Sequence, residues 1–181
     1  MNSGISTHEE KRFHGEGGIP DNEEQMTKKR AHVTVRAVTP GDYGAWKPLW
    51  DDYNAFYERT GPTALPDEVH DTLWRRFFDA SEPVHCIVAE RDGKLVGICH
   101  YLYHRSTSRL ELLCYLQDLF TAPDYRGHGI GRALIEKVYV IAKETGCKRV
   151  YWQTHTTNTP GRTLYDKVAK NFGFIVYAKD V

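Results

Sequence analysis

The sequence predicts a mixed α/β domain with a mixed, mainly antiparallel sheet and helices on both faces. Three observations lead to this prediction. Apolar residues recur with helical spacing over residues 46–57, strand-like runs with short connections fill residues 84–120, and a glycine-rich turn then joins a strand to a helix. The expected element order is therefore β-α-α-β-β-β-α-β-α-β.

Composition places the chain among proteins without a strongly charged surface. Its 181 residues carry 24 Lys and Arg against 24 Asp and Glu, and this length suffices for one domain with a sizeable core. With balanced charge and no run of membrane-spanning length, we expect no nucleic-acid and no membrane partner. Residues 1–30 hold almost no aliphatic core material, so we expect a disordered extension there and the folded domain over 31–181.

The cysteines are expected to be free thiols in a reducing compartment. None forms a Cys-x-x-Cys pair, and three lie in apolar, strand-like runs, so we expect no metal site. The start of the chain lacks the apolar stretch of a secretory signal. The cytoplasm is therefore the expected location, with the nucleus left open. The four cysteines are Cys86, Cys99, Cys114 and Cys147.

The first part of the chain predicts one strand and two helices. Apolar and polar residues alternate over 33–37, as in a half-buried strand. A helical stripe follows over 46–57, where Pro48 indicates either a kink or a late helix start. Gly61-Pro62 ends this helix, and a second helix is expected over 66–79.

Three consecutive strands come next, and their short connections predict antiparallel neighbours. They are expected over residues 84–90, 95–103 and 110–120. The turn between the first two contains Asp92-Gly93, a strong signal for a hairpin. An antiparallel block therefore precedes the glycine-rich turn.

The last part of the chain predicts a crossover and a closing helix and strand. A strand–helix–strand connection places its two strands parallel, so the strand after the glycine-rich turn should lie parallel to the one before it. Proline behind a threonine N-cap predicts the start of the last helix. The expected elements are a helix over 131–145, a strand over 149–154, a helix from Thr159-Pro160 to about 171–173, and a strand over 174–177.

The glycine-rich turn is the most informative segment, and it covers residues 126–131 with the sequence RGHGIG. Such a turn directs several backbone N–H groups toward one point, and the helix adds unpaired donors and a positive dipole end. This predicts a phosphate-bearing ligand. A dinucleotide fold needs an acidic residue at the end of the next strand, and this strand ends in YWQT, without a carboxylate. A Walker loop needs Gly-Lys-Ser/Thr, and residues 131–133 read GRA. The turn therefore matches neither motif.

The surrounding sequence resembles the acetyl-CoA motif of the GNAT acetyltransferase superfamily. The family core, Arg/Gln-x-x-Gly-x-Gly/Ala, is met by Arg126, Gly129 and Gly131. A second match lies downstream, at the family's usual separation. It consists of Asn158, Leu164-Tyr165 and Gly173-Phe174. The resemblance covers the folded domain and is greatest to the small histone, polyamine and D-amino-acid acetyltransferases.

The resemblance implies direct acetyl transfer from acetyl-CoA to an amine, with no metal ion. Backbone N–H groups of the loop would hold the pyrophosphate, and the strand before the loop would pair through its main chain with the pantetheine arm. Asn158 would add a side-chain contact, or is simply a turn residue. The implied cofactor residues are Leu119, Phe120, Thr121, Arg126, Gly127, His128, Gly129, Ile130, Gly131, Arg132 and Asn158.

Catalysis needs an acid for the leaving thiolate and a base for the ammonium. Tyr165 occupies the family's position for the acid, and the alternative is a core tyrosine. For the base, Asp118 and His155 both stay open. Polyamine-type members carry a glutamate just before this aspartate, whereas this chain has Gln117. No role is expected for the histidines of the antiparallel strands, which are His85, His100 and His104.

The acceptor site of this fold lies between the first helices and the sheet. Trp50, Tyr53 and Tyr57 would wall it and bind an ammonium by cation–π contact, or they are plain core. The expected substrate is the primary amine of a small molecule, of amino-acid or polyamine type. The alternatives are a protein lysine and, outside the enzymes, a non-catalytic acyl-CoA-binding regulatory domain. The family often dimerises through its last strands or sheet edges, which implies a homodimer.

Overall fold

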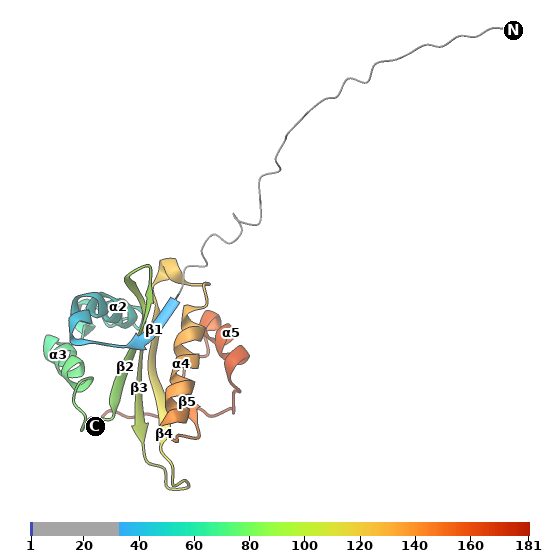
Figure 1. The fold of residues 1–181 in the computed structure, drawn as a ribbon. Coiled ribbons are helices and arrows are strands. Elements are labelled where there is room, and N and C mark those ends of the chain that lie inside the picture. Colours follow the sequence, from blue (N-terminus) through green and yellow to red (C-terminus); the bar gives the residue numbers. More distant parts are fainter. Residues whose placement is uncertain (2–32) are drawn as a thin grey trace. The chain divides into compact units, whose positions relative to one another are not determined.

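Five strands form one sheet in the computed structural model, which describes residues 33–181 together with Met1 (Figure 1). From edge to edge the strands are β1 (Val33–Ala37), β2 (Val84–Arg91), β3 (Lys94–His104), β4 (Leu113–Thr121) and β5 (Val150–Tyr151). β1 to β4 run antiparallel to one another, and β5 runs parallel to β4. The mixed, mainly antiparallel sheet is therefore confirmed. The extension predicted over residues 1–30 lies outside the described residues, apart from Met1.

Helices cover both faces of the sheet, as the sequence predicts (Figure 1). One face carries α2 (Tyr43–Phe56) and α3 (Asp67–Arg76), and the other carries α4 (Ile130–Glu144) and α5 (Thr159–Val168). Each helix forms because its apolar residues recur every three or four positions, which gives one buried stripe. Short 3₁₀ helices lie at Pro40–Asp42, Gly61–Thr63 and Pro123–Tyr125.

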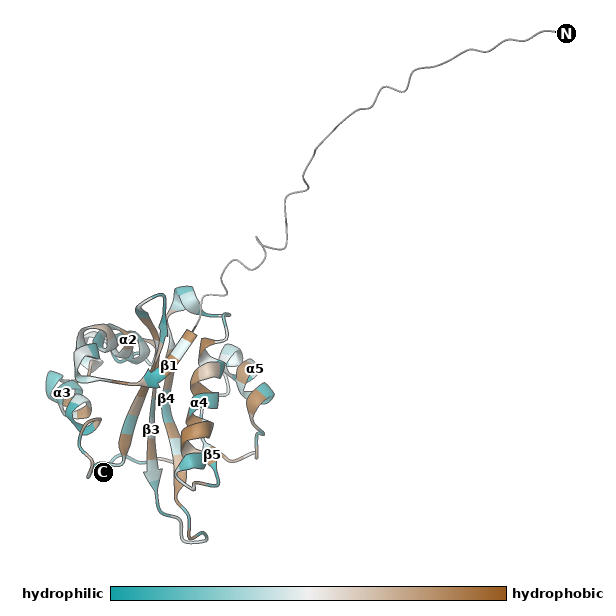
Figure 2. Cartoon of the chain, in the orientation of Figure 1, coloured by the Kyte–Doolittle hydropathy of each residue, from teal (hydrophilic) through white to brown (hydrophobic). Residues whose placement is uncertain are grey.

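The sheet separates two apolar cores. Aliphatic side chains dominate the core under α4, where Leu134 and Val138 are fully buried. Aromatic side chains dominate the core under α2, around Trp46 and Trp50. Figure 2 shows the apolar segments along the sheet and on α4. The two cores therefore offer different surroundings to any polar group that the sheet places on one face or the other.

Several predicted boundaries are wrong by a few residues. Pro48 lies inside α2, which begins at Tyr43, so the late helix start is wrong. β4 begins only at Leu113, and the side chain of Leu110 is 94% exposed. The other differences shorten elements: the second helix ends at Arg76, β5 keeps two of the residues 149–154, and the last helix ends at Val168.

The predicted closing strand over residues 174–177 is wrong for the single chain. Residues 169–181 are described and form neither helix nor strand. Phe174 is 89% exposed and Tyr177 is 88% exposed. A strand forms only where a neighbouring strand offers backbone partners, and β5, the last strand of the sheet, is two residues long.

The cysteines are free and buried, as expected. Burial raises the pKa of the Cys86 and Cys99 thiols well above its usual range, so both stay protonated near neutral pH. Across residues 33–181, no helix is both long enough and apolar enough to cross a bilayer.

Candidate active site

β4 and β5 pair at only two positions and then diverge, which opens a gap in the sheet. Their pairing is limited to Cys114 with Val150 and Tyr115 with Tyr151, whereas β4 continues to Thr121. The backbone of residues 116–121 is therefore paired toward β3 and unpaired toward β5. This open edge contains Leu119, Phe120 and Thr121, whose side chains are buried or half-buried. Their main chains are therefore hydrogen-bonding groups without a partner strand on the β5 side.

The loop between β4 and α4 depends on glycine at two positions. Gly127 has a φ of 77° and Gly129 a φ of 81°, a left-handed conformation that costs other residues about 1–2 kcal/mol. Gly129 is the N-cap of α4 and has no side chain with which to cap the helix. The N–H groups of the first turn therefore stay available to an anion, as the sequence predicts.

The remaining loop residues contribute main chain, packing or charge. Ile130 is 1% exposed, so only its backbone can meet a ligand. Nδ1 of His128 lies 2.8 Å from the carbonyl oxygen of Arg126, a hydrogen bond within the loop. Nε of Arg126 donates to the carbonyl oxygen of Thr121 at 3.1 Å, across the mouth of the gap. Arg132 is paired with Glu136, one helical turn along α4, at 3.4 Å.

Gly131 has a different function from the other two glycines. A Cβ added at this position would lie 3.1 Å from Cδ2 of Leu164 and 3.8 Å from Oγ1 of Thr121. Gly131 therefore lets α4 approach both α5 and the end of β4. The loop glycines thus serve two purposes, conformation at two positions and close packing at the third.

Asn158 is the N-cap residue of α5. Its Oδ1 accepts a hydrogen bond from the Gly161 N–H at 3.1 Å, and its Nδ2 donates to Thr154 Oγ1 at 2.9 Å. A Cβ on Gly161 would lie 2.6 Å from Nδ2 of Asn158, so this glycine leaves room for the cap. A carboxamide has two N–H donors, and one of them is used in this cap.

Tyr165 is half-buried on α5 and contacts Trp152, just beyond β5. The ring centroids of the two lie 5.4 Å apart. Burial, with a smaller contribution from the Tyr57 phenol, raises the pKa of Tyr165 to about 12. The phenol therefore keeps its proton throughout the neutral and mildly alkaline range. A group of this kind can donate a proton to a thiolate, whose conjugate acid has a pKa near ~8.5.

The aromatic residues predicted for the acceptor site form a continuous row along α2. The rings of Trp50 and Tyr53 are stacked, with centroids 5.2 Å apart, and the centroids of Tyr53 and Tyr57 lie 5.1 Å apart. The Tyr57 ring lies 5.9 Å from the ring of His155, which follows β5. Nε1 of Trp50 is buried and has no hydrogen-bond partner among the residues described. The row therefore links the core under α2 with the far side of the gap.

Asp118 lies beside this row because of an irregularity in the sheet. The register between β3 and β4 shifts so that Gln117 is an extra residue, and this turns Asp118 toward α2. Asp118 is only 7% exposed. Burial, with a smaller contribution from the neighbouring Asp118, raises the pKa of the Tyr53 phenol far above its usual range. The structure thus places Tyr53 beside Asp118, and Tyr57 near Tyr53, His155 and Tyr165.

His100 is a site residue that the sequence reasoning missed. Its Nδ1 lies 3.0 Å from Oδ2 of Asp118, and its Nε2 accepts from the indole N–H of Trp46 at 3.0 Å. Trp46 and Asp118 are 54 and 18 residues away in sequence, so no local spacing connects them to His100. Only the expected pairing of the strands at 95–103 and 110–120 pointed to such a contact.

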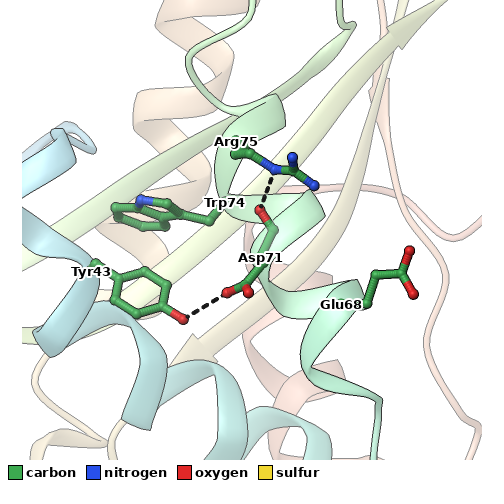
Figure 3. A pocket seen from close by; sticks show the side chains of 5 residues that line it. All are labelled: Tyr43, Glu68, Asp71, Trp74 and Arg75. Atoms are coloured by element: carbon green, nitrogen blue, oxygen red, sulfur yellow. Dashed lines mark hydrogen bonds between the residues drawn. The ribbon is translucent and has the colours of Figure 1, made fainter.

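An open hollow lies between α2 and α3 (Figure 3). The hydroxyl of Tyr43 donates to Asp71 at 3.2 Å, and Nε of Arg75 donates to the backbone oxygen of Asp71 at 3.3 Å. Glu68 and Trp74 complete the lining. None of the aromatic residues predicted for the acceptor site lines this hollow. Within the described part of the chain, no cluster of three or more His, Cys, Asp or Glu side chains could hold a metal ion.

Comparison with known proteins gives a family match and full-length relatives. Residues 46–174 match the model of the acetyltransferase (GNAT) family. The D-amino-acid N-acetyltransferase HPA3 of Saccharomyces cerevisiae is 34% identical over 161 residues, which cover 88% of this chain and 98% of that protein. The thialysine N-epsilon-acetyltransferase of Bos taurus is 32% identical over 145 residues, or 75% of this chain and 82% of that protein.

A similar fold occurs in an aminoglycoside N-acetyltransferase, AAC(6')-Iy, solved in complex with a bisubstrate analogue of CoA. The TM-score is 0.71 over 83% of this chain and 99% of that chain. At 16% identity, this likeness concerns the fold alone.

Proposed function

Because the chain belongs to the GNAT acetyltransferase family, it is an N-acetyltransferase, and we propose that it acetylates the primary amine of a small molecule of amino-acid or polyamine type with acetyl-CoA. One observation carries the proposal. The open edge of β4 begins at an uncapped helix N-terminus and runs past Asp118, while Tyr165 lies across the gap on α5. We assign residues 31–181 as the catalytic domain.

Acetyl-CoA would bind along the gap between β4 and β5. The N–H groups between Gly127 and Arg132 would receive the pyrophosphate, with the α4 dipole behind them. The unpaired backbone of residues 119–121 would pair with the pantetheine arm like an added strand. The free N–H of Asn158 would contact the arm from the far wall. Arg126 and Arg132 would add positive charge at the pyrophosphate.

In the reaction, the amine nitrogen attacks the thioester carbonyl, an N–C bond forms and the C–S bond breaks. The leaving thiolate takes a proton from the Tyr165 phenol. The ammonium substrate must first lose a proton, because a free amine of pKa ~10.4 is almost wholly protonated at neutral pH. We assign this step to Asp118, whose carboxylate is buried beside the row of aromatic rings. His155, exposed in the segment that follows β5, is the second candidate.

The aromatic row supports a cationic, amino-acid-like acceptor. Tyr57, half-buried beside the buried Tyr53, would offer a ring face to an ammonium near the Asp118 carboxylate. The orphaned indole N–H of Trp50 is a donor for a carbonyl or carboxylate oxygen of the same substrate. The relatives named for D-amino acids and thialysine support the same substrate class.

Release of the CoA thiol, measured against a panel of amines, tests this function. We expect turnover with amino acids or polyamines and a loss of kcat of about 10²-fold in Tyr165→Phe. Tyr139→Phe is the matched control, because this half-buried phenol donates to a backbone oxygen on α5 and faces no gap. Turnover only with peptide lysines would reassign the substrate, and acetyl-CoA binding without turnover on any amine would identify a binding domain.

We propose further that the protein is a cytoplasmic homodimer. The unpaired thiols support a reducing compartment. The exposed apolar side chains of residues 174–177 support a strand that pairs with a second copy, because an apolar segment of this kind rarely stays in water. Light scattering should then show a dimer that Ile175→Asp converts to a monomer. Val181→Asp, at the exposed chain end, is the control.

A further inference from the structure

A chain of hydrogen bonds connects three buried side chains from three elements. Trp46 on α2 donates to Nε2 of His100 on β3, and Nδ1 of His100 meets Oδ2 of Asp118 on β4, both at 3.0 Å. We propose that His100 is a positioning residue, which orients the Asp118 carboxylate and keeps it ionised as the base. This inference rests on the proposed role of Asp118 in acetyl transfer.

The tautomer of His100 follows from the chemistry of its partners. An indole N–H can only donate, so Nε2 of His100 must accept and carries no proton. The single proton of the neutral ring is therefore on Nδ1, from which it is donated to Asp118. A doubly protonated ring would place an N–H against the N–H of Trp46, so the contact with Asp118 is a hydrogen bond from neutral histidine.

Aromatic rings enclose this chain of hydrogen bonds. Trp46 and His100 are 0% and 1% exposed. The ring centroids of Trp50 and Phe77 each lie 4.9 Å from that of His100, and the centroids of Trp74 and Trp46 are separated by the same distance. In such surroundings a carboxylate stays ionised only if donors compensate its charge. His100 is therefore more than packing, since it supplies one of those donors.

The other titratable groups around Asp118 stay neutral in the range where catalysis takes place. Burial raises the pKa of each of them, and their protonated forms carry no charge near neutral pH. Two of the neighbours hydrogen-bond Asp118, the Tyr53 phenol and His100, and His100 is the one that is held in turn by a buried donor, the indole of Trp46. The groups are Tyr53 on α2, Cys86 on β2, Cys99 on β3 and Tyr115 on β4.

The first experiment measures the tautomer and needs no activity. Nitrogen-15 NMR of the imidazole should show His100 as the neutral Nδ1–H form from pH 6 to pH 9, a window set around the ordinary histidine value of ~6.5. In Trp46→Phe, Nε2 loses its donor, and the signal should change form or begin to titrate. Trp74→Phe replaces an indole of the same cluster by a smaller ring without removing a partner of His100, and should leave the signal unchanged. An Nε2–H form or an imidazolium in the unaltered protein would overturn the proposal.

The second experiment compares two substitutions of His100 by the pH dependence of kcat/KM. His100→Asn keeps an N–H donor where Nδ1 stands, whereas His100→Leu removes it. Without the donor, Asp118 should hold its proton to higher pH, so the acidic limb in His100→Leu should move up by about one pH unit, with roughly tenfold lower kcat/KM on that limb. His100→Asn should keep the original limb.

The two experiments separate failure of this inference from failure of the proposed function. An acidic limb that is unmoved in folded His100→Leu, while Tyr165→Phe is impaired, would leave the acetyl transfer intact and overturn the role of His100. If His100→Leu does not fold, the same limb measured in Trp46→Phe decides, because that change also releases the Nδ1 proton from its fixed position. Equal shifts in His100→Asn and His100→Leu would reduce His100 to packing.

Discussion

The loop at residues 126–131 and the chain from Trp46 to Asp118 are built from different atoms. The loop exposes backbone N–H groups, and its glycines have left-handed φ values or stand where a Cβ would crowd a neighbouring side chain. The chain from Trp46 to Asp118 consists of side chains, each nearly or fully buried, that three different elements contribute. The half of the site proposed for the acetyl donor, the donor half, thus depends on local backbone conformation. The half proposed for the amine acceptor, the acceptor half, depends on tertiary packing.

This difference predicts which changes each half tolerates. Main-chain groups survive any substitution that preserves φ and ψ, so the loop should be sensitive at its glycines and tolerant elsewhere. A buried polar chain fails when one partner is lost, because the remaining group is left without its hydrogen bond. Substitutions can therefore separate the two halves kinetically.

Asp118→Asn should have the largest effect and confine it to the acceptor half. The carboxamide keeps the size of the side chain and removes the base, so kcat should fall by about 10²- to 10⁴-fold. The KM for acetyl-CoA should stay as it is. Steady-state kinetics with acetyl-CoA and amine varied separately would measure both constants. Asp166→Asn, an exposed carboxylate on α5, should change neither. A full rate in Asp118→Asn would move the base to His155 or to water.

Gly129→Ala should act on the donor half, with a smaller effect. The φ of 81° places the new Cβ in a left-handed conformation, which costs about 1–2 kcal/mol, and relief of that strain would turn the N–H groups of α4 away from the ligand. We expect the KM for acetyl-CoA to rise by roughly tenfold and the KM for the amine to stay unchanged. Gly44→Ala is the control, since α2 has open space at this position, and it should stabilise the fold by about 0.5–1 kcal/mol.

The same difference explains what the sequence could predict. Glycine spacing reports directly on backbone conformation, so the loop, its helix and the direction of β5 were predicted correctly. His100 was missed because its partners come from α2 and β4, and its neighbours in β3 are those of an ordinary core strand. Asp118 was found through the motif, but the reason for its orientation, the extra residue Gln117, is visible only in the paired strands. The closing strand at 174–177 was predicted from composition, which does not say whether a partner strand exists.

Tyr165 belongs to neither half, and the pH dependence of kcat that it controls gives the smallest expected effect, because kcat should not change between pH 8 and pH 10. An ordinary phenol, with a pKa near ~10, would be half ionised at pH 10 and would lose half of its power to protonate the thiolate. Burial raises the pKa of Tyr165 to about 12. Because the shift is upward, Tyr165 holds its proton to higher pH in the folded protein. We therefore expect kcat at saturating amine to stay level from pH 8 to about pH 10. A decline by half at pH 10 that disappears in Tyr165→Phe would show an ordinary, exposed phenol. The proton for the leaving thiolate would then come from a group that the solvent can reach. The contact between Tyr165 and Trp152 would then have no effect on the protonation of the thiolate.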